Sequence, residues 1–513
     1  MTERYYITTA INYPNGRPHM GHAYEAIATD FIARFRRLEG REVFFLTGTD
    51  EHGLKIAQAA RAAGQSPREY VSEMVHHFKE MDEVLNISYD RFIRTTEPDH
   101  YACVQDLWTR MEASGDIYLG KYEGWYSVRD EAYYDEKELI AGDDGEKLSP
   151  EGTPVEWTVE ESYFFRLSAY QEKLLALYEA QPDFIQPAHR LNEMKSFVSG
   201  GLRDLSISRT SFDWGVPVPG TTDHVMYVWL DALSNYLSGV GYPDESYRDW
   251  WPCDVHVIGK DVVRFHSVYW PAFLMSAGIE LPKAVFGHGF VLWDGKKMSK
   301  SSGNVVEPLG LAARYGTDQL RYFLLREVPF GHDGAYSEDA IVTRANADLA
   351  NDLGNLAQRC LSMIAKNCEG RVPEPSTPTP ADKALDMALS DILSEMQDHM
   401  GRLQIHSALE TLWRQVGETN AYFAGREPWA LKKTDPEAMG SVLYRTADAV
   451  RQLAILAQPA VPEGAAKLLD LLAVPENERS FDALGNKLRP GTELPAPKGV
   501  FPRLERQTEE TAS

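Results

Sequence analysis

Cysteine is scarce in this sequence, and no two cysteines stand in a C-x-x-C pair. Only four occur among 513 residues: Cys103, Cys253, Cys360 and Cys368. A disulfide framework needs paired cysteines in a secreted chain, and a thiolate zinc site needs closely spaced ones. The sequence supports neither, and we expect reduced thiols packed in the interior.

The chain also lacks a long apolar run and an excess of basic residues. No segment is apolar enough to span a bilayer, and the start lacks the basic and then apolar stretch of an export signal. The net charge of -24 argues against general nucleic-acid affinity but leaves room for a local basic surface. We therefore expect a cytoplasmic protein of two to four domains that does not bind membranes.

The first forty residues predict a strand, a turn and a helix. Residues 5–11 are aromatic and β-branched, as in a buried strand, and apolar residues recur at helical spacing from Ala23 to Phe35. A helix that starts at the carboxyl edge of a sheet binds anions. His19 and His22 stand at that start and could donate hydrogen bonds to a phosphate, although this segment alone fits ordinary surface or core histidines equally well.

A second strand and helix follow, which predicts a parallel sheet. Residues 43–47 read as a buried strand and end in the polar turn 48–53, while Ser66 and Glu69 form a capping-box pattern that opens a helix. Strand-helix-strand-helix order is typical of an α/β fold of the Rossmann type. We assign its first half to residues 1–115.

The pattern changes twice further along the chain. Residues 116–215 carry short aromatic segments and an acidic loop, which suggests an inserted connective domain. Strand patterns resume at 225–229, 255–259 and 285–291, so we assign the second half of the Rossmann domain to 216–296. After a connecting region at 297–345, amphipathic helices predict an all-α domain over 346–513 with an extended tail.

A second phosphate-type signal is the lysine-rich loop at 297–301. Lys297 and Lys300 flank methionine and serine there, and such a loop can close over a polyphosphate and neutralise the charge of a leaving group. Taken alone, a lysine-rich loop is more often simple solvated surface.

Together these two signals resemble a known enzyme family. The motifs at 19–22 (His-Met-Gly-His) and 297–301 (Lys-Met-Ser-Lys-Ser) are similar to the two signatures of class I aminoacyl-tRNA synthetases, and further blocks resemble methionyl-tRNA synthetases: residues 10–13, 48–53, 227–232, 259–261 and 265–267. The resemblance implies ATP-dependent activation of methionine to the adenylate, with release of pyrophosphate, and transfer of methionine to the 3′-terminal ribose of the methionine and initiator tRNAs. ATP and Mg2+ are the implied cofactors.

The resemblance also implies roles for single residues. His19, His22, Lys297 and Lys300 would hold the ATP phosphates, and Asp261 the ribose. Asp50 would take the ammonium group of methionine, and the side-chain pocket would be walled by Ile11, Tyr13, Trp229, Ala232, Tyr236, Phe265 and His266. An aromatic pocket suits a polarizable thioether, although any one of these aromatic residues alone would more often be ordinary core.

Discrimination against leucine and isoleucine needs more than volume, since one methylene is worth only ~1–3 kcal/mol. The hydroxyl groups of Tyr13 and Tyr236 and the imidazole of His266 are candidates for a polar contact near the sulfur atom. Leu233 stands where many relatives have proline, which bears on the shape of the pocket.

The insertion departs from many relatives, which carry a zinc knuckle made of C-x-x-C pairs. Residues 122–131 occupy the equivalent region without cysteine. We therefore expect no structural zinc there and instead aromatic packing by Trp125, Tyr126 and Tyr133. The insertion is also short for the editing domain of the isoleucyl, valyl and leucyl enzymes.

In the helical domain, Asn355, Arg359 and Trp429 resemble the anticodon-reading positions of the family. Amide and guanidinium groups bond exposed base edges, and tryptophan offers a stacking face. The short tail predicts a monomer. Two alternatives stay open at this point: a small-molecule nucleotidyltransferase, and a non-catalytic tRNA-binding relative.

Overall fold

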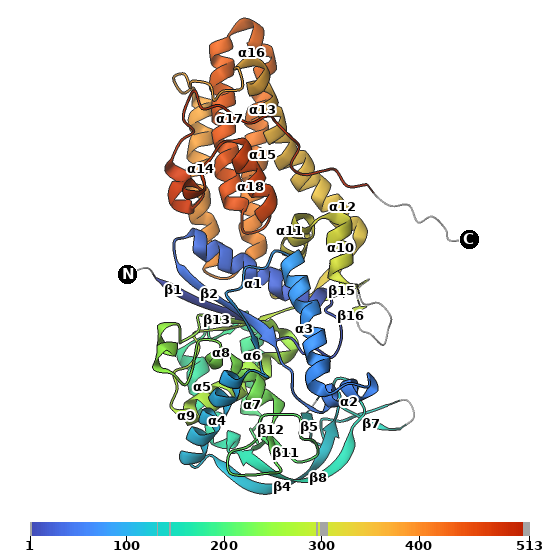
Figure 1. Cartoon of the computed structure of the whole chain (residues 1–513). Coiled ribbons are helices and arrows are strands. Elements are labelled where there is room, and N and C mark those ends of the chain that lie inside the picture. The colour runs from blue at the N-terminus through green and yellow to red at the C-terminus, as the bar shows by residue number, and fades with distance from the viewer. Residues whose placement is uncertain (1–2, 131, 143–144, 294–295, 298–305, 506–513) are drawn as a thin grey trace, which may run out of the picture.

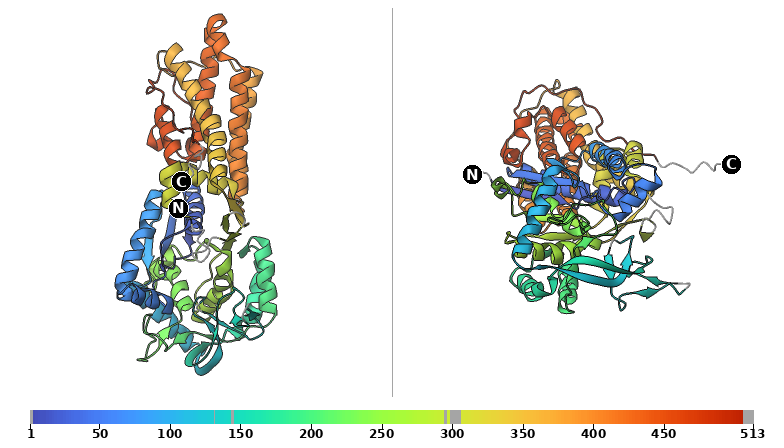
Figure 2. Two further views of the ribbon diagram at one scale, coloured as in Figure 1. Left: turned by 90° about the vertical axis from the view of Figure 1, so that its right-hand side faces the viewer. Right: turned by 60° about the horizontal axis from the view of Figure 1, so that its bottom comes forward.

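The computed structural model describes residues 3–130, 132–142, 145–293, 296–297 and 306–505. The molecule is elongated, with a helical domain at one end, a parallel sheet in the middle and an antiparallel sheet at the other end (Figures 1 and 2). The C-terminal tail runs back from the helical domain along its side, and its Leu504 pairs through both backbone groups with the Asn346 amide.

The central sheet has six parallel strands in the order β3-β2-β1-β13-β14-β9. Their bounds are β1 Arg4–Thr9, β2 Glu42–Thr49, β3 Arg91–Arg94, β9 Ile185–Gln186, β13 Val255–Gly259 and β14 Val285–His288. The strand order reverses between β1 and β13, and ligands of such sheets bind at the carboxyl ends of the strands on either side of the reversal. The predicted α/β class with a parallel sheet is confirmed.

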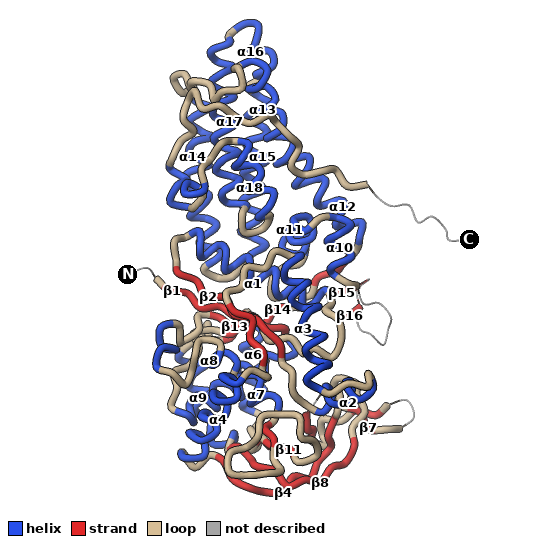
Figure 3. The backbone as a smooth tube through the Cα atoms, in the orientation of Figure 1, coloured by secondary structure: helices blue, strands red, loops and turns tan. Residues whose placement is uncertain are grey.

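Helices cover both faces of this sheet (Figures 1 and 3). Successive residues of a strand point to opposite faces, so Ile7 joins the core beside α1 and the helical domain, whereas Tyr6 joins the core on the other side. The helices of this region are α1 Met20–Leu38, α2 Leu54–Ala62, α3 Pro67–Val84, α4 Pro98–Ala113, α7 Val228–Leu233, α8 Asn235–Ser238 and α9 Trp270–Ala277. Short 3-10 or π turns are η2 Glu245–Asp249, η3 Lys260–Val262 and η4 Phe265–Tyr269.

Two strand predictions were wrong. The segment 225–229 forms only the two-residue strand β12, Val225–Met226, which pairs with β11, Ser208–Arg209, outside the central sheet, and helix α7 begins at Val228. A continuous apolar run has no period that separates a strand from a buried helix. The segment 285–291 divides after β14, because Val291 opens β15 in a separate small sheet.

The region predicted as an insertion is built on two long antiparallel strands. β4 Ile117–Ser127 pairs with β8 Glu156–Phe165, flanked by β5 Ala132–Tyr134 and β10 Leu205–Ser206. The hairpin β6 Ile140–Ala141 and β7 Lys147–Leu148, then η1 Leu167–Tyr170, α5 Gln171–Ala180 and α6 Ala188–Ser199 complete it. Strand β9, from the same stretch of sequence, pairs with β14 and so extends the central sheet.

The tip of this region is held by hydrogen bonds and ring contacts. Asp130 Oδ2 accepts from Ser149 Oγ at 2.6 Å, Thr153 Oγ1 at 2.6 Å and Tyr134 Oη at 3.1 Å. The rings of Tyr126 and Tyr133 lie 4.7 Å apart, and Trp125 contacts Trp157 edge to face. The aromatic residues named from the sequence thus pack there, while the absence of zinc stays a prediction.

The predicted C-terminal helical domain is present, and a short connecting region precedes it. The connection holds β15 Val291–Trp293, β16 Lys296–Lys297, α10 Pro308–Tyr315, α11 Thr317–Glu327, β17 Gly334–Tyr336 and α12 Glu338–Arg344. The domain comprises η6 Ala345–Gly354, α13 Asn355–Asn367, α14 Pro380–Met400, α15 Ile405–Gly425, α16 Pro428–Thr434, α17 Pro436–Ala457, α18 Pro462–Leu471, η7 Glu476–Glu478 and η8 Phe481–Gly485. No helix among the described residues is long and apolar enough to cross a membrane.

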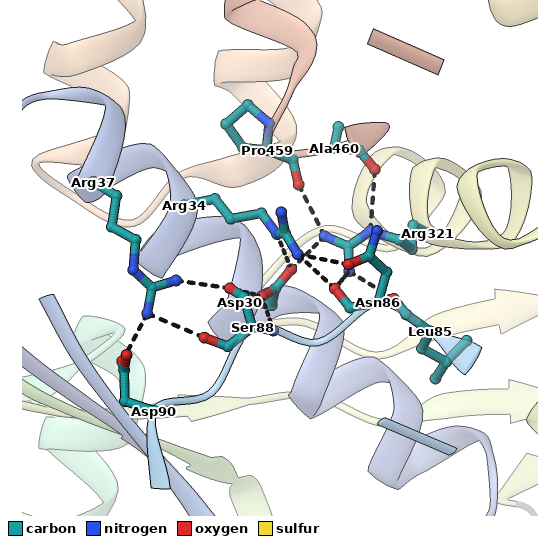
Figure 4. A network of polar contacts seen from close by, with 10 residues as sticks. All are labelled: Asp30, Arg34, Arg37, Leu85, Asn86, Ser88, Asp90, Arg321, Pro459 and Ala460. Atoms are coloured by element: carbon teal, nitrogen blue, oxygen red, sulfur yellow. Dashed lines mark hydrogen bonds and ion pairs between the residues drawn. The ribbon is translucent and has the colours of Figure 1, made fainter. Parts of the chain in front are cut away.

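A buried arginine joins the helical domain to α1 (Figure 4). The Arg321 guanidinium on α11 donates to Asp30 Oδ2 on α1 at 2.6 Å and to the carbonyl of Pro459, beyond α17, at 2.9 Å. Neither side chain of the Arg321–Asp30 pair is exposed. Because His19 caps the start of α1, the helix that begins at the candidate site is fixed directly to the helical domain.

Candidate active site

A cavity of about 440 Å³ lies at the carboxyl ends of β1, β2 and β13, beside the start of α1. It brings together side chains that the sequence names from distant segments. Those that line it are Ile11, Tyr13, His19, His22, Asp50, Trp229, Ala232, Tyr236, Asp261 and His266. Phe265 stands directly behind Trp229 and lines the neighbouring cavity.

The two histidines cap the first turn of α1. His19 Nδ1 accepts from the Gly21 amide, and His22 Nδ1 accepts from the His19 amide, each at 3.1 Å. With Nδ1 occupied as an acceptor, a neutral ring carries its hydrogen on Nε2, which can donate to a phosphate oxygen. The rings stack at 3.8 Å, and a Cβ atom at Gly21 would lie 2.9 Å from the His19 ring, so a larger residue there would displace that ring.

Asp50 stands at the end of β2, where two loops are tied together. Its amide donates to the Asn12 carbonyl at 2.9 Å, and the Asn12 amide donates to the Gly48 carbonyl at 2.8 Å. The carboxylate is buried and lines the same cavity as Trp229. A buried carboxylate opposite an aromatic wall can bind an ammonium group that carries an apolar side chain.

The aromatic wall comes from α7 and from the π turn η4. Trp229 and Phe265 stack with ring centroids 3.7 Å apart and planes 4° from parallel. His266 Nδ1 lies 2.9 Å from the Val262 carbonyl, which can only accept, so Nδ1 carries the hydrogen. Burial lowers the pKa of His266 to about 4, and the neutral ring therefore accepts at Nε2 from the Tyr236 hydroxyl, 2.6 Å away.

Glu25 and His288 line the cavity as well, and neither was among the predicted site residues. Glu25 Oε1 accepts from the Ala10 amide at 3.0 Å, and Oε2 lies 2.9 Å from His288 Nε2. Burial raises the pKa of Glu25. Burial alone would lower the pKa of His288, but the hydrogen bond to Glu25 and the Glu25 charge outweigh it, so the pKa of His288 is raised. The sequence feature that could have pointed to Glu25 is its position three residues after His22, which places both side chains on the same side of α1.

The lysines of the second motif are not placed by the structure. Lys300 lies outside the described residues, and of Lys297 only the backbone in β16 is described. Asp261 is in η3, between β13 and the wall residues. The neighbouring Lys260 bonds both carboxylate oxygens of Asp333, at 2.8 and 2.7 Å.

Of the predicted anticodon residues, Asn355 and Arg359 belong to α13 and Trp429 to α16, and α16 is at the end of the helical domain away from the central sheet (Figure 1). The guanidinium of Arg359 on α13 lies 5.0 Å from the Phe423 ring and 5.5 Å from the Trp429 ring. Trp429 is 45% exposed. Asn355 is exposed one turn before Arg359, so the three predicted residues share one region.

Comparison with known proteins identifies the family. Residues 5–361 match the family model described as tRNA synthetases class I (M), and residues 372–512 match the anticodon binding domain of methionyl tRNA ligase. A methionine-tRNA ligase of Brucella suis biovar 1 is 61% identical over 508 residues, 98% of each chain. A methionine-tRNA ligase of Mycobacterium tuberculosis strain H37Rv is 59% identical over 509 residues, again 98% of each chain.

Solved structures give the same result. The M. tuberculosis methionyl-tRNA synthetase in complex with methionyl-adenylate aligns with a TM-score of 0.96 at 59% identity, covering 98% of this chain and 100% of that one. The apo form of the same enzyme aligns with a TM-score of 0.90 at 55% identity, covering 99% of each chain. The chain belongs to the methionyl-tRNA synthetases, the class I enzymes that ligate methionine to tRNA.

Proposed function

We propose that this methionine-tRNA ligase activates methionine in the cavity at the carboxyl ends of β1, β2 and β13. One observation carries the assignment: the same cavity is lined by the His19–His22 pair and by Asp50 and Trp229. A triphosphate and an amino acid thus have adjacent sites. The products of the first step are methionyl-adenylate and pyrophosphate. A hydroxyl of the 3′-terminal ribose of tRNA then takes the methionyl group from the adenylate, and AMP leaves.

In the first step a carboxylate oxygen of methionine attacks the α-phosphorus of ATP. The new P–O bond forms as the bond to pyrophosphate breaks, so no side chain needs to act as nucleophile. The protein contributes by positioning the reactants and by stabilising charge. His19 and His22 donate from Nε2 to phosphate oxygens, aided by the positive end of α1.

The other nucleotide contacts are assigned from the motifs. Asp261 binds the ribose, and its place on the cavity wall supports that role. Lys297 and Lys300 neutralise the departing pyrophosphate, on the evidence of the motif resemblance alone. Mg2+ would bind together with ATP, held mainly by the phosphate oxygens. The described residues contain no group of three His, Cys, Asp or Glu that could hold a metal ion. We assign the ion no step.

Methionine selection rests on Asp50 and the aromatic wall. Asp50 pairs with the ammonium group, and the thioether lies among Ile11, Tyr13, Trp229, Ala232, Tyr236 and His266, with Phe265 stacked behind Trp229. The hydroxyl hydrogen of Tyr236 is engaged by His266 Nε2. The sulfur atom of methionine therefore contacts the fixed Tyr236–His266 pair. The branched side chains of leucine and isoleucine would instead contact rigid aromatic faces.

Recognition of the tRNA anticodon is assigned to the helical domain. Asn355, Arg359 and Trp429 read the anticodon of the methionine and initiator tRNAs, because an exposed indole and a guanidinium suit unpaired bases.

We keep the domain boundaries at 115/116, 215/216, 296/297 and 345/346. We also propose a monomer, located in the cytoplasm and without structural zinc, since none of the four cysteines falls in the tip of the insertion.

The test is pyrophosphate exchange with each of the twenty amino acids, followed by charging of bulk tRNA. We expect exchange that depends on methionine and charging with methionine only. Exchange without charging would favour a small-molecule nucleotidyltransferase. Neither activity would favour a non-catalytic tRNA-binding protein, and either result would contradict the proposal.

A further inference from the structure

A second cluster of titratable groups lies next to the cavity but outside its lining. Asp231 on α7 is fully buried, and its carboxylate receives two imidazoles. His52 Nδ1 lies 2.6 Å from Oδ2, and His100 Nε2 lies 2.7 Å from Oδ1. No side chain of the three is more than 1% exposed. The motif at 48–53 contains His52, and nothing in the proposed chemistry uses it.

The outer nitrogen of each imidazole is tied as well. His52 Nε2 lies 2.9 Å from the Tyr101 hydroxyl, and His100 Nδ1 lies 2.8 Å from Ser238 Oγ. Burial alone would raise the pKa of Asp231, but the two imidazoles outweigh it and hold the pKa at about 2. The carboxylate is therefore ionised at neutral pH, and both imidazole nitrogens that face it donate.

The cluster joins the two elements that hold methionine in the proposed site. His52 follows Asp50 by two residues, and the backbone beside it is fixed by bonds from the Glu51 amide to Thr95 Oγ1 at 2.9 Å and from the Gly53 amide to the Trp214 carbonyl at 3.1 Å. Asp231 follows Trp229 by two residues. If the His52–Asp231 contact shifts, the distance between the Asp50 carboxylate and the Trp229 wall therefore changes.

Helix α7 needs such an anchor because it is short. It spans six residues, Val228–Leu233, whereas isolated helices below about 12 residues are marginal in water. Four of its residues line the cavity, namely Val228, Trp229, Ala232 and Leu233, and Asp231 does not. The orientation of the wall thus depends on contacts such as those of Asp231.

We propose that Asp231, held by His52 and His100, is a positioning residue that sets the distance between the ammonium site at Asp50 and the Trp229 wall. The inference rests on the proposed function and deepens it. Asp231 touches no substrate. It selects amino acids by fixing where the ammonium group and the side chain can both be accommodated.

The test compares steady-state kinetics of pyrophosphate exchange by the full chain and its variants. In Asp231→Asn the amide nitrogen opposes an imidazole N–H, and one charge-assisted bond is lost. We expect KM for methionine to rise about tenfold or more, with KM for ATP nearly unchanged. The matched control is Asp448→Asn, which removes a similarly buried carboxylate partner of Arg451 in the helical domain and should leave both KM values unchanged.

Conservative replacement separates positioning from simple loss of packing. His52→Gln keeps an N–H donor toward Asp231 and should retain most of the methionine affinity, whereas His52→Ala should lose it. If Asp231→Asn does not fold, this pair carries the test, with methionine binding followed by tryptophan fluorescence. Equal methionine KM in Asp231→Asn and Asp448→Asn, or equal behaviour of the two His52 variants, would overturn the inference. Failure of the proposed function is distinct, because the unmodified chain would then show no methionine-dependent exchange.

Discussion

The cavity and the far end of the helical domain hold their polar groups in opposite ways. In the cavity, Tyr236 bonds His266 and Glu25 bonds His288, and all four side chains are buried. At the far end, Arg359 lies against Trp429, which is almost half exposed. Fixed, desolvated groups suit a reaction that needs stationary charge, whereas an exposed ring and cation suit bases that arrive on a flexible loop.

The largest effect should follow from breaking the junction between the two regions. Arg321→Ala removes the buried guanidinium that pairs with Asp30, and it leaves the carbonyls of Leu85 and Pro459 without this donor. We expect a loss of about 3–5 kcal/mol in the free energy of unfolding. Thermal or urea unfolding measures it.

An exposed ion pair serves as the control for the junction. Arg41→Ala removes a partner of the largely exposed Glu3 and should cost less than about 1 kcal/mol. A loss in Arg321→Ala no larger than in Arg41→Ala would show that the two regions are not held together at this point.

Acidification should lower the stability that the cavity residue His266 contributes to the fold. The pKa of His266 is lowered from 6.5 to about 4 in the folded protein, so the unfolded chain binds a proton that the folded chain refuses. Stability from this residue is full above pH 6.5 and falls as the pH drops toward 4, by about 3 kcal/mol in total. Unfolding curves from pH 7 to 4 measure this slope. His266→Gln should flatten it, and an unchanged slope would contradict a neutral His266.

At the helical end, one aromatic replacement should affect tRNA alone. Trp429→Ala removes an exposed stacking face, which is worth about 1–3 kcal/mol per base. We expect KM for tRNA to rise in aminoacylation while methionine-dependent pyrophosphate exchange stays unchanged. Met387→Ala, at another exposed apolar residue of the domain, is the matched control. Equal tRNA kinetics in the two variants would remove Trp429 from the anticodon site.

The smallest effect concerns the tip of the insertion. We predict that metal analysis of the purified chain finds no stoichiometric zinc and that a chelator leaves the thermal unfolding temperature unchanged. Asp130 and its hydroxyl partners hold this tip by hydrogen bonds. One zinc ion per chain would refute the prediction.

The sequence predicted those features that local patterns encode. The strand, turn and helix around residues 19–22 and the Ser66–Glu69 capping box follow from residue types at fixed spacing, and both are present. The change from strand to helix patterns near residue 340 likewise located the helical domain.

Features that depend on distant partners were not predictable. Glu25 meets His288 across 263 positions of the chain, and Asp231 meets His52 across 179. Neither local segment shows which distant residue its carboxylate meets. The apolar run 225–229 was misassigned because burial on all sides removes the period that separates strand from helix.

The most direct measurement of the central claim is methionine-dependent pyrophosphate exchange by His19→Ala. This variant removes one donor to the ATP phosphates at the start of α1 and leaves Asp50 and the Trp229 wall intact. We predict a fall in the exchange rate of about 10²–10³-fold, with methionine binding retained. An exchange rate equal to that of the unmodified chain would contradict the assignment of this cavity as the site of methionine activation.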